Sequence, residues 1–241
     1  DERFVFYRQH KVNSDLFNSL YRASLQEQEI EVVTKSLSRA SSGSYLVSKD
    51  GSATVFSQDR PQTPMSDLFH FNFINGRTNE IFRSDLSGYY SYGEPMALVG
   101  TDGKTLITRL VTNEYIENYK FIYDFALVSL DGTGSQRFRN WIDEAFVVSP
   151  DRRYIYLTST NKAEGYLVDA DLWTISTTPK FKKVQFKQDS LLGTDGVSLL
   201  SLDLKSKLVT SLCESQNSSS LLQDFAMSPN SSFVLTVEQD A

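Results

Sequence analysis

The chain has 241 residues, with 24 Lys and Arg against 30 Asp and Glu, a net charge of −6, and 2 His. This length fits one large domain or two small ones, and either can bury a sizeable core. A hydrophobic share of 40% with 22% charged residues is ordinary globular composition, which excludes wholesale disorder. The acidic balance argues against nucleic-acid binding, because a nucleic-acid binder needs a basic surface to neutralise phosphates.

The single cysteine, Cys213, excludes an intramolecular disulfide and any zinc site built from several cysteines. No run of about 18 apolar residues occurs, so we expect a soluble chain without a membrane span. The chain starts at Asp1 in a strand-like run with no apolar leader, so any targeting signal is expected to have been removed. A cytoplasmic location and a periplasmic or other extracytoplasmic one both stay open, as does the oligomeric state.

Short runs rich in Val, Ile, Phe, Tyr, Leu and Thr recur along the chain, bounded by Gly, Asp, Ser and Pro. Examples lie at residues 4–7, 68–73, 121–128 and 154–157. Several of these runs are apolar throughout, which is typical of strands covered on both faces. Only residues 24–33 also fit a helix, and the valines at their end suit a strand equally well. The sequence therefore predicts an all-β fold.

A tight turn between two apolar runs recurs roughly every 50 residues, with one wider gap near the end of the chain. Asp or Asn favours such a turn because its side chain bonds the following backbone, while Gly accepts a left-handed conformation and Pro presets φ. We therefore expect antiparallel hairpins over residues 45–58, 96–111 and 145–159. Their predicted turns are Asp50-Gly51, Asp102-Gly103 and Pro150-Asp151.

A second hairpin follows each of these units. Residues 67–73 are followed by the Asn75-Gly76 turn and another apolar run, and Asp131-Gly132 marks the same turn in the next repeat. Two hairpins in each repeat of about 45–50 residues predict one four-stranded antiparallel sheet per repeat, which is the period of β-propeller blades. A compressed blade is expected over residues 190–210, so that about five to six blades are recognisable.

The pattern Ser149-Pro150-Asp151, then alternating apolar residues, an Asp-apolar-aromatic unit and an Asp-Gly turn, resembles the WD-like repeats of TolB-type β-propellers. It is similar as well to the repeats in the propeller domains of prolyl-oligopeptidase-like and dipeptidyl-peptidase-like proteins. Asp50 with Gly51 and Asp102 with Gly103 occupy the same turn positions. The resemblance covers nearly the whole chain and implies a β-propeller, but it implies no activity.

Both ends of the chain carry incomplete repeats. Residues 221–241 supply the first two strands of a blade and residues 3–35 supply the last three, so pairing them would leave one strand too many. We therefore expect residues 1–241 to be a single β-propeller domain excised from a longer chain. The alternative is a ring in which one terminal strand is displaced.

The sequence predicts no catalytic residue. The Gly-x-Ser-x-Gly motif of α/β-hydrolases is absent, and His10 and His70 are the only imidazoles that could act as a base. Since His70 lies inside a strand-like run, we expect it to have a packing role. Asp143-Glu144 and Asp169 with Asp171 are the nearest candidates for a glycosidase carboxylate pair, and we interpret them as solvated turn acids. We also expect no metal site and no cofactor, because two distant histidines and scattered acids give no ligand spacing.

Aromatic residues gather in segments that we expect to be loops on one face of the blades. Tyr and Trp outside strands are typical of partner-binding surfaces, and Arg near strand ends can bind a carboxylate. The predicted partner-binding residues are Tyr89, Tyr90, Tyr92, Tyr115, Tyr119, Trp141, Arg60 and Arg109. A purely structural role, capping blades or plugging a central opening, is the alternative for these side chains.

The leading functional hypothesis is therefore a non-enzymatic β-propeller scaffold that binds a protein or peptide partner through one loop face. The alternative is the substrate-gating propeller domain of a serine peptidase whose catalytic domain lies outside this chain. A propeller glycosidase or lyase is the third hypothesis, and it would need acids or histidines that converge on a central opening.

Overall fold

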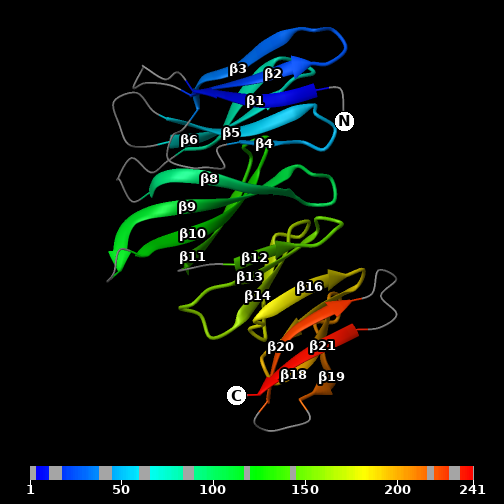
Figure 1. Ribbon diagram of the computed structural model, residues 1–241. Coiled ribbons are helices and arrows are strands. Elements are labelled where there is room, and N and C mark those ends of the chain that lie inside the picture. The colour runs from blue at the N-terminus through cyan, green and yellow to red at the C-terminus, as the bar shows by residue number, and fades with distance from the viewer. Residues whose placement is uncertain are drawn as a thin grey trace. The chain divides into compact units, whose positions relative to one another are not determined.

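The computed structural model describes residues 4–10, 18–37, 45–59, 66–83, 90–116, 120–141, 145–215, 220–227 and 234–240. In these ranges every regular element is a β-strand and no helix occurs, so the predicted all-β class is confirmed (Figure 1). Hence no described segment is a helix able to span a membrane. The chain divides into two compact units, Asp1–Ile142 and Asp143–Ala241.

The first unit consists of three antiparallel meanders, in which consecutive strands pair. The first meander is β1 (Phe4–His10), β2 (Asn18–Ser24) and β3 (Ile30–Leu37). The second is β4 (Tyr45–Val47), β5 (Ala53–Asp59), β6 (Ser66–Asn72) and β7 (Arg77–Phe82). The third is β8 (Tyr90–Val99), β9 (Thr105–Ile116), β10 (Lys120–Ser129) and β11 (Ser135–Trp141). One bridge between Leu37 and Gln58 joins β3 to β5, so the first two meanders share one sheet.

The second unit continues the same pattern. One four-stranded sheet is β12 (Ala145–Val148), β13 (Tyr154–Thr158), β14 (Gly165–Asp169) and β15 (Thr174–Thr178). The next is β16 (Lys183–Lys187), β17 (Ser190–Thr194), β18 (Ser198–Asp203) and β19 (Val209–Glu214). A two-stranded sheet of β20 (Ser220–Met227) and β21 (Val234–Asp240) follows. The predicted repeat of four strands and the incomplete repeats at both ends are therefore present.

The three predicted hairpins are confirmed, and each turns at the predicted residues. In the β4–β5 turn, Asp50 Oδ1 accepts hydrogen bonds from Ser48 Oγ at 2.7 Å and from the Ser52 backbone N–H at 3.1 Å. Gly51 follows with a φ of 70°, and Arg152 takes this left-handed position after Asp151 with a φ of 64°. The Asp side chain thus organises the turn even where no glycine follows it.

The Asp50 turn, and the Asp131 turn between β10 and β11, make the stability of the fold sensitive to acid. Hydrogen bonds from Ser48 and Ser52 lower the pKa of Asp50 to about 2, and bonds from Ser129 and Thr133 lower the pKa of Asp131 to about 2. Because these pKa values lie below the ordinary aspartate value of 3.8, the ionised turns stabilise the fold above that pH. This contribution is lost as the pH falls from about 4 towards about 2.

We therefore expect the midpoint of thermal unfolding to fall across this acidic range, and to fall less steeply in Asp50→Asn and Asp131→Asn. The amide keeps a hydrogen-bond acceptor in the turn but cannot take up a proton. Circular dichroism melts between about pH 2 and pH 6 measure the slope, where carboxyl groups titrate. An identical slope in the wild type and in both variants would contradict the assignment.

The core of the first unit lies between the β4–β7 sheet and the β8–β11 sheet. The middle strands of both sheets are deeply buried: Val55 of β5 is 1% exposed and Leu106 of β9 is 0% exposed. Leu68, Leu110 and Val128 are buried in the same cluster. Apolar runs in the sequence become strands packed on both faces, as predicted from their lack of alternation.

In the second unit, Tyr156 holds the linker that joins β15 to β16. Its hydroxyl donates a hydrogen bond to the Pro179 carbonyl at 3.0 Å and accepts one from the Phe181 N–H at 2.7 Å. Lys180, between these two residues, donates to the carbonyls of Ser159 and Lys162 at 2.7 and 2.8 Å. The linker backbone is therefore fixed on both sides of Lys180.

Two glycines make room for this linker. A Cβ atom on Gly165 would lie 2.3 Å from the Tyr156 hydroxyl and 2.7 Å from the Pro179 carbonyl. A Cβ atom on Gly193 would lie 2.3 Å from Cγ of the Phe181 ring. Both positions therefore need glycine for its missing side chain, because every other residue would collide with the linker.

Candidate partner-binding surface

Strands β8, β9 and β10 bring the central tyrosines of the predicted surface to one end of a single sheet. Tyr90 and Tyr92 begin β8, where they pair with Thr112 and Val111 of β9. Tyr115 lies near the end of β9 and pairs with Phe121 of β10. The backbone therefore places all three tyrosines at the end opposite the Asp102-Gly103 turn.

The expectation that these tyrosines lie in loops is wrong, because β8 runs for 10 residues and β9 for 12 residues. Both strands continue past the apolar segments that mark them in the sequence. The β-propensity of Tyr and Thr is consistent with this extension. Tyr89, Tyr119 and Arg60 lie outside the described residues.

Trp141 does not belong to an exposed surface. It is the last residue of β11, and its side chain is 2% exposed. The indole Nε1 donates to the Phe138 carbonyl at 3.0 Å, and the ring packs edge-on against Phe125 with centroids 5.3 Å apart. Trp141 is therefore part of the core, which corrects its assignment to a partner-binding junction.

Arg109 lies in the middle of β9 rather than at a strand end, opposite Glu94 of β8 and Phe125 of β10. Its guanidinium carbon is 4.6 Å from the centroid of the Tyr123 ring. Such a cation–π contact orients the guanidinium along the sheet. Arg109 thus has a packing role and remains partly exposed.

The histidine and acidic residues considered for catalysis have structural environments. His70 lies in β6, and its Nδ1 atom is buried without a hydrogen-bond partner among the described residues. No carboxylate therefore orients the ring, as the base of a catalytic triad would need. The side chain of His10 and the Asp143-Glu144 pair lie outside what the structure describes.

Asp169 is buried rather than solvated, with 6% of the residue exposed. Arg153 donates to both of its oxygens, from Nε at 3.1–3.3 Å and from Nη2 at 2.9 Å. Asp169 Oδ1 also accepts the backbone N–H groups of Asp171 and Leu172 at 3.1 and 3.2 Å. Both oxygens of the carboxylate therefore accept hydrogen bonds within the protein, as expected of an aspartate that stabilises a turn. Neither oxygen is free to accept a proton from a substrate.

This ion pair belongs to a larger polar cluster that the sequence did not reveal. The Arg153 guanidinium lies 5.1 Å, and the Lys207 ammonium 4.9 Å, from the centroid of the Tyr154 ring. Burial lowers the pKa of Lys207, while the hydrogen bond to Asp169 raises the pKa of Arg153. The cluster ties the β12–β15 sheet to the β18–β19 turn, so we assign it to stability.

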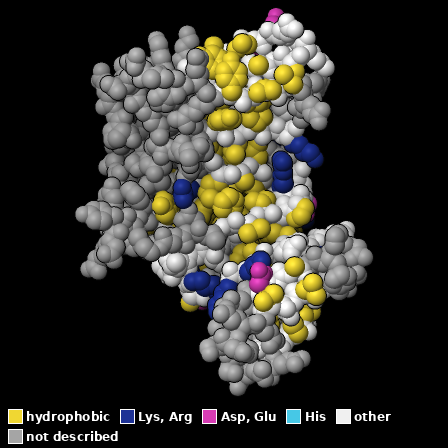
Figure 2. All heavy atoms as spheres, in the orientation of Figure 1, with side chains coloured by type: hydrophobic (Ala, Val, Ile, Leu, Met, Phe, Trp, Pro, Cys, Tyr) yellow, Lys and Arg dark blue, Asp and Glu magenta, His cyan; other side chains and the backbone are white. Residues whose placement is uncertain are grey.

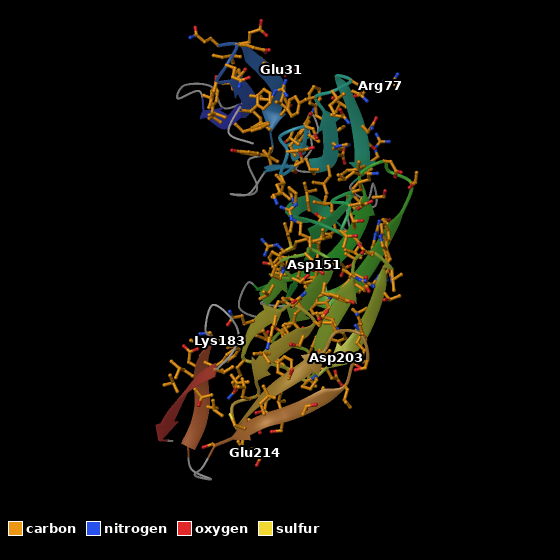
Figure 3. All side chains as sticks on the ribbon, turned by 90° about the vertical axis from the view of Figure 1, so that its right-hand side faces the viewer. Glu31, Arg77, Asp151, Lys183, Asp203 and Glu214 are labelled. Carbon is orange, nitrogen blue, oxygen red and sulfur yellow. The ribbon has the colours of Figure 1, made fainter. Side chains whose placement is uncertain are left out.

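We also searched the described residues for metal sites, surface patches and further charge contacts. No group of three or more His, Cys, Asp or Glu side chains suited to a metal ion occurs within the described ranges. Hydrophobic side chains are prominent on the face shown in Figure 2, and the Lys and Arg side chains coloured there are scattered. Another charge contact in the second unit joins Lys183 of β16, which is labelled in Figure 3, to Asp224 of β20.

No protein-family model and no curated protein matches the chain. Solved structures do match. Dipeptidyl peptidase 4 from Porphyromonas gingivalis has a TM-score of 0.57 at 10% identity, over 99% of this chain and 43% of that chain. A prolyl endopeptidase has a TM-score of 0.54 at 13% identity, over 93% of this chain and 37% of that chain.

The β-propeller domain of the Trilobed protease from Pyrococcus furiosus has a TM-score of 0.50 at 11% identity, over 99% of this chain and 72% of that chain. A TolB from Acinetobacter baumannii is a more distant match. This chain spans about two fifths of the two longer peptidases, with 37% and 43% of their chains covered. Its antiparallel meanders and the matches to the three peptidase structures together show an all-β fold of the β-propeller type, as in the propeller domains of peptidases.

Proposed function

We propose that this chain is the non-catalytic propeller domain of a serine-peptidase-type protein, in which it selects the peptides that reach a separate catalytic domain. The similarity to dipeptidyl peptidase 4, to a prolyl endopeptidase and to the propeller of a protease carries this proposal. The partial coverage of the two longer enzymes supports it, because the chain corresponds to one part of each. In this role the chain binds peptide segments and performs no chemistry.

The test uses the full 241-residue chain and a panel of short proline-containing peptides. We expect saturable binding in calorimetry, intact peptides by mass spectrometry after long incubation, and no labelling by a fluorophosphonate probe for serine hydrolases. Peptide cleavage or fluorophosphonate labelling would overturn the non-catalytic assignment. Absence of binding to every peptide would overturn peptide selection.

A second candidate function is a scaffold for a folded protein partner, bound through the tyrosine-bearing end of the β8–β9 hairpin. The common position of Tyr90, Tyr92 and Tyr115 at one end of that sheet favours it. Tyrosine combines a large apolar ring with a wet hydroxyl at low cost in rotamer entropy, which suits a binding surface. Retention of a folded protein, with no peptide binding, would favour this function over the first.

For either function, we expect Tyr90→Ala or Tyr92→Ala to weaken binding by about 2 kcal/mol or more, because interface energy concentrates in a few aromatic anchors. The melting temperature should remain nearly unchanged. Asp102→Ala is the matched control, since it lies in the turn at the opposite end of the same hairpin and should leave affinity intact. Variants that unfold while the folded fraction still binds would assign the tyrosines to structure.

A further inference from the structure

His70 occupies an unusual place for an ionisable side chain. It lies in the middle of β6, paired with Val55 of β5 on one side and Asn79 of β7 on the other. Because directly paired residues point to the same face of a sheet, His70 shares its face with Val55. Val55 belongs to the core cluster between the β4–β7 and β8–β11 sheets, so His70 faces the same junction.

The ring makes one hydrogen bond across this junction. It donates to the backbone carbonyl of Leu130, which follows β10 and is 8% exposed in the same core cluster. Since Nδ1 has no partner, Nε2 carries the donated proton. The neutral ring in this tautomer therefore satisfies one nitrogen and leaves the other as an unused acceptor against apolar surroundings.

A second polar atom nearby offers the ring no hydrogen bond. Ser57 Oγ is buried and also without a partner, and Ser57 pairs with Leu68, two residues before His70. A protonated ring would carry a second N–H group at Nδ1, which has no hydrogen-bond partner among the described residues as they are arranged. Burying such an unsatisfied charged donor is unfavourable, because desolvation is not compensated.

Charged groups near β6 do not offset the cost of burying a protonated His70 ring. The charged residues on β6 and the elements around it include Asp59 of β5, Asp67 of β6, Arg77 and Glu80 of β7, Glu94 of β8, Lys104, Asp124 of β10 and Asp131. Arg137 of β11 lies over the Phe82 ring of β7, with its guanidinium carbon 5.5 Å from the ring centroid. Asp131 accepts bonds from Ser129 and Thr133 within its own turn, and Glu80 is exposed beside Arg83. Burial lowers the pKa of His70, the Leu130 carbonyl acts in the opposite sense, and no charged group among the described residues contributes.

We propose that His70 is a proton-sensitive contact between the β4–β7 and β8–β11 sheets, intact when the ring is neutral and weakened when it is protonated. The folded state disfavours the proton relative to the unfolded chain. Stability is therefore fully present above the ordinary histidine pKa of 6.5 and is lost as the pH falls below it. Mild acid would then loosen this junction before the carboxyl groups of the turns titrate.

The chain has only 2 histidines, so the His70 signal can be assigned by replacing His10 alone. The ring proton signals of the wild type and of His10→Gln, followed by NMR against pH, identify His70 as the signal that remains in the variant. We expect its titration midpoint below 6.5, together with faster amide hydrogen exchange at Val55 and Leu130 as it protonates. Amides of β13 in the second unit serve as the internal control and should not change.

His70→Gln supplies the second arm, because the glutamine amide can donate to the Leu130 carbonyl but does not titrate. From about pH 7.5 to about pH 5.5 we expect the unfolding equilibrium constant to rise about fivefold in the wild type and in His10→Gln. It should stay nearly constant in His70→Gln. A His70 midpoint at or above 6.5 would overturn the proposal, as would an unchanged pH dependence in His70→Gln. If His70→Gln does not fold, the ring titration and the amide exchange of the wild type and of His10→Gln test the proposal without it.

Discussion

Replacing Leu106 by alanine is expected to lower the free energy of unfolding by about 2–5 kcal/mol, the range for deleting a fully buried leucine side chain. Leu106 is 0% exposed and lies in β9, the second strand of its sheet. It packs in the cluster that joins the β4–β7 and β8–β11 sheets, beside Leu68 and Leu98. The close packing of two sheets leaves little room for the surroundings to collapse into the cavity.

Urea denaturation followed by circular dichroism measures this change. Leu25→Ala is the matched control in the same unit, because Leu25 is 59% exposed in the turn between β2 and β3. It should alter the free energy of unfolding by less than about 0.5 kcal/mol. If Leu106→Ala costs as little as the control, the strand does not lie between two sheets and the blade assignment fails.

Gly193→Ala should destabilise the fold by about 1–3 kcal/mol, the range for forcing extra atoms into a packed interior. The new Cβ atom would lie 2.3 Å from Cγ of Phe181 and 2.7 Å from both Cδ atoms. The ring cannot turn away freely, since Phe181 is 4% exposed and its N–H is held by the Tyr156 hydroxyl. The collision therefore transfers strain to the linker between β15 and β16.

A double-mutant cycle separates this collision from other effects of alanine. Phe181→Ala removes the Cγ and Cδ atoms that the new methyl group would meet, so Gly193→Ala should cost less in that background than in the wild type. Thermal and urea unfolding of the four proteins give the coupling energy. Additive effects of the two substitutions would show that Gly193 and Phe181 do not compete for the same space.

The turns could be predicted from the sequence because their chemistry is local. At Asp50 the acceptor, its donors at Ser48 and Ser52 and the left-handed Gly51 lie within five consecutive residues. Nothing distant is needed to form such a turn, so its signal survives in the sequence. The four-stranded period follows from the spacing of these turns in the same way.

The ends of strands could not be predicted so well. Tyr90, Tyr92 and Tyr115 lie in strands because β8 and β9 pair beyond their apolar cores, and pairing depends on the partner strand. Trp141 is buried because Phe125 of a neighbouring strand covers its ring. An aromatic residue between two apolar runs has the same local signature whether it faces solvent or a neighbouring strand.

The polar cluster around Asp169 shows the same limit. Asp169 and Arg153 are separated by 16 residues, and their ion pair forms only because β13 and β14 are neighbours in one sheet. From the sequence alone Asp169 is one more acid near a turn. Asp169 can be buried because the side chain of Arg153 and the backbone N–H groups of the turn hydrogen-bond to it. Neither interaction produces a recognisable sequence motif.

The meander topology has a consequence for how the chain acquires its structure. Apart from the single bridge between Leu37 and Gln58, every strand pairing in the described residues joins consecutive strands. Such pairings close short loops, so the entropy lost before the first contacts form is small and each meander can nucleate by itself. Within each unit, folding should therefore advance from one sheet to the next, as in repeat proteins. A nascent chain of this design can order each unit in the order of its synthesis, and a completed sheet gives the next sheet of the same unit an apolar surface on which to assemble.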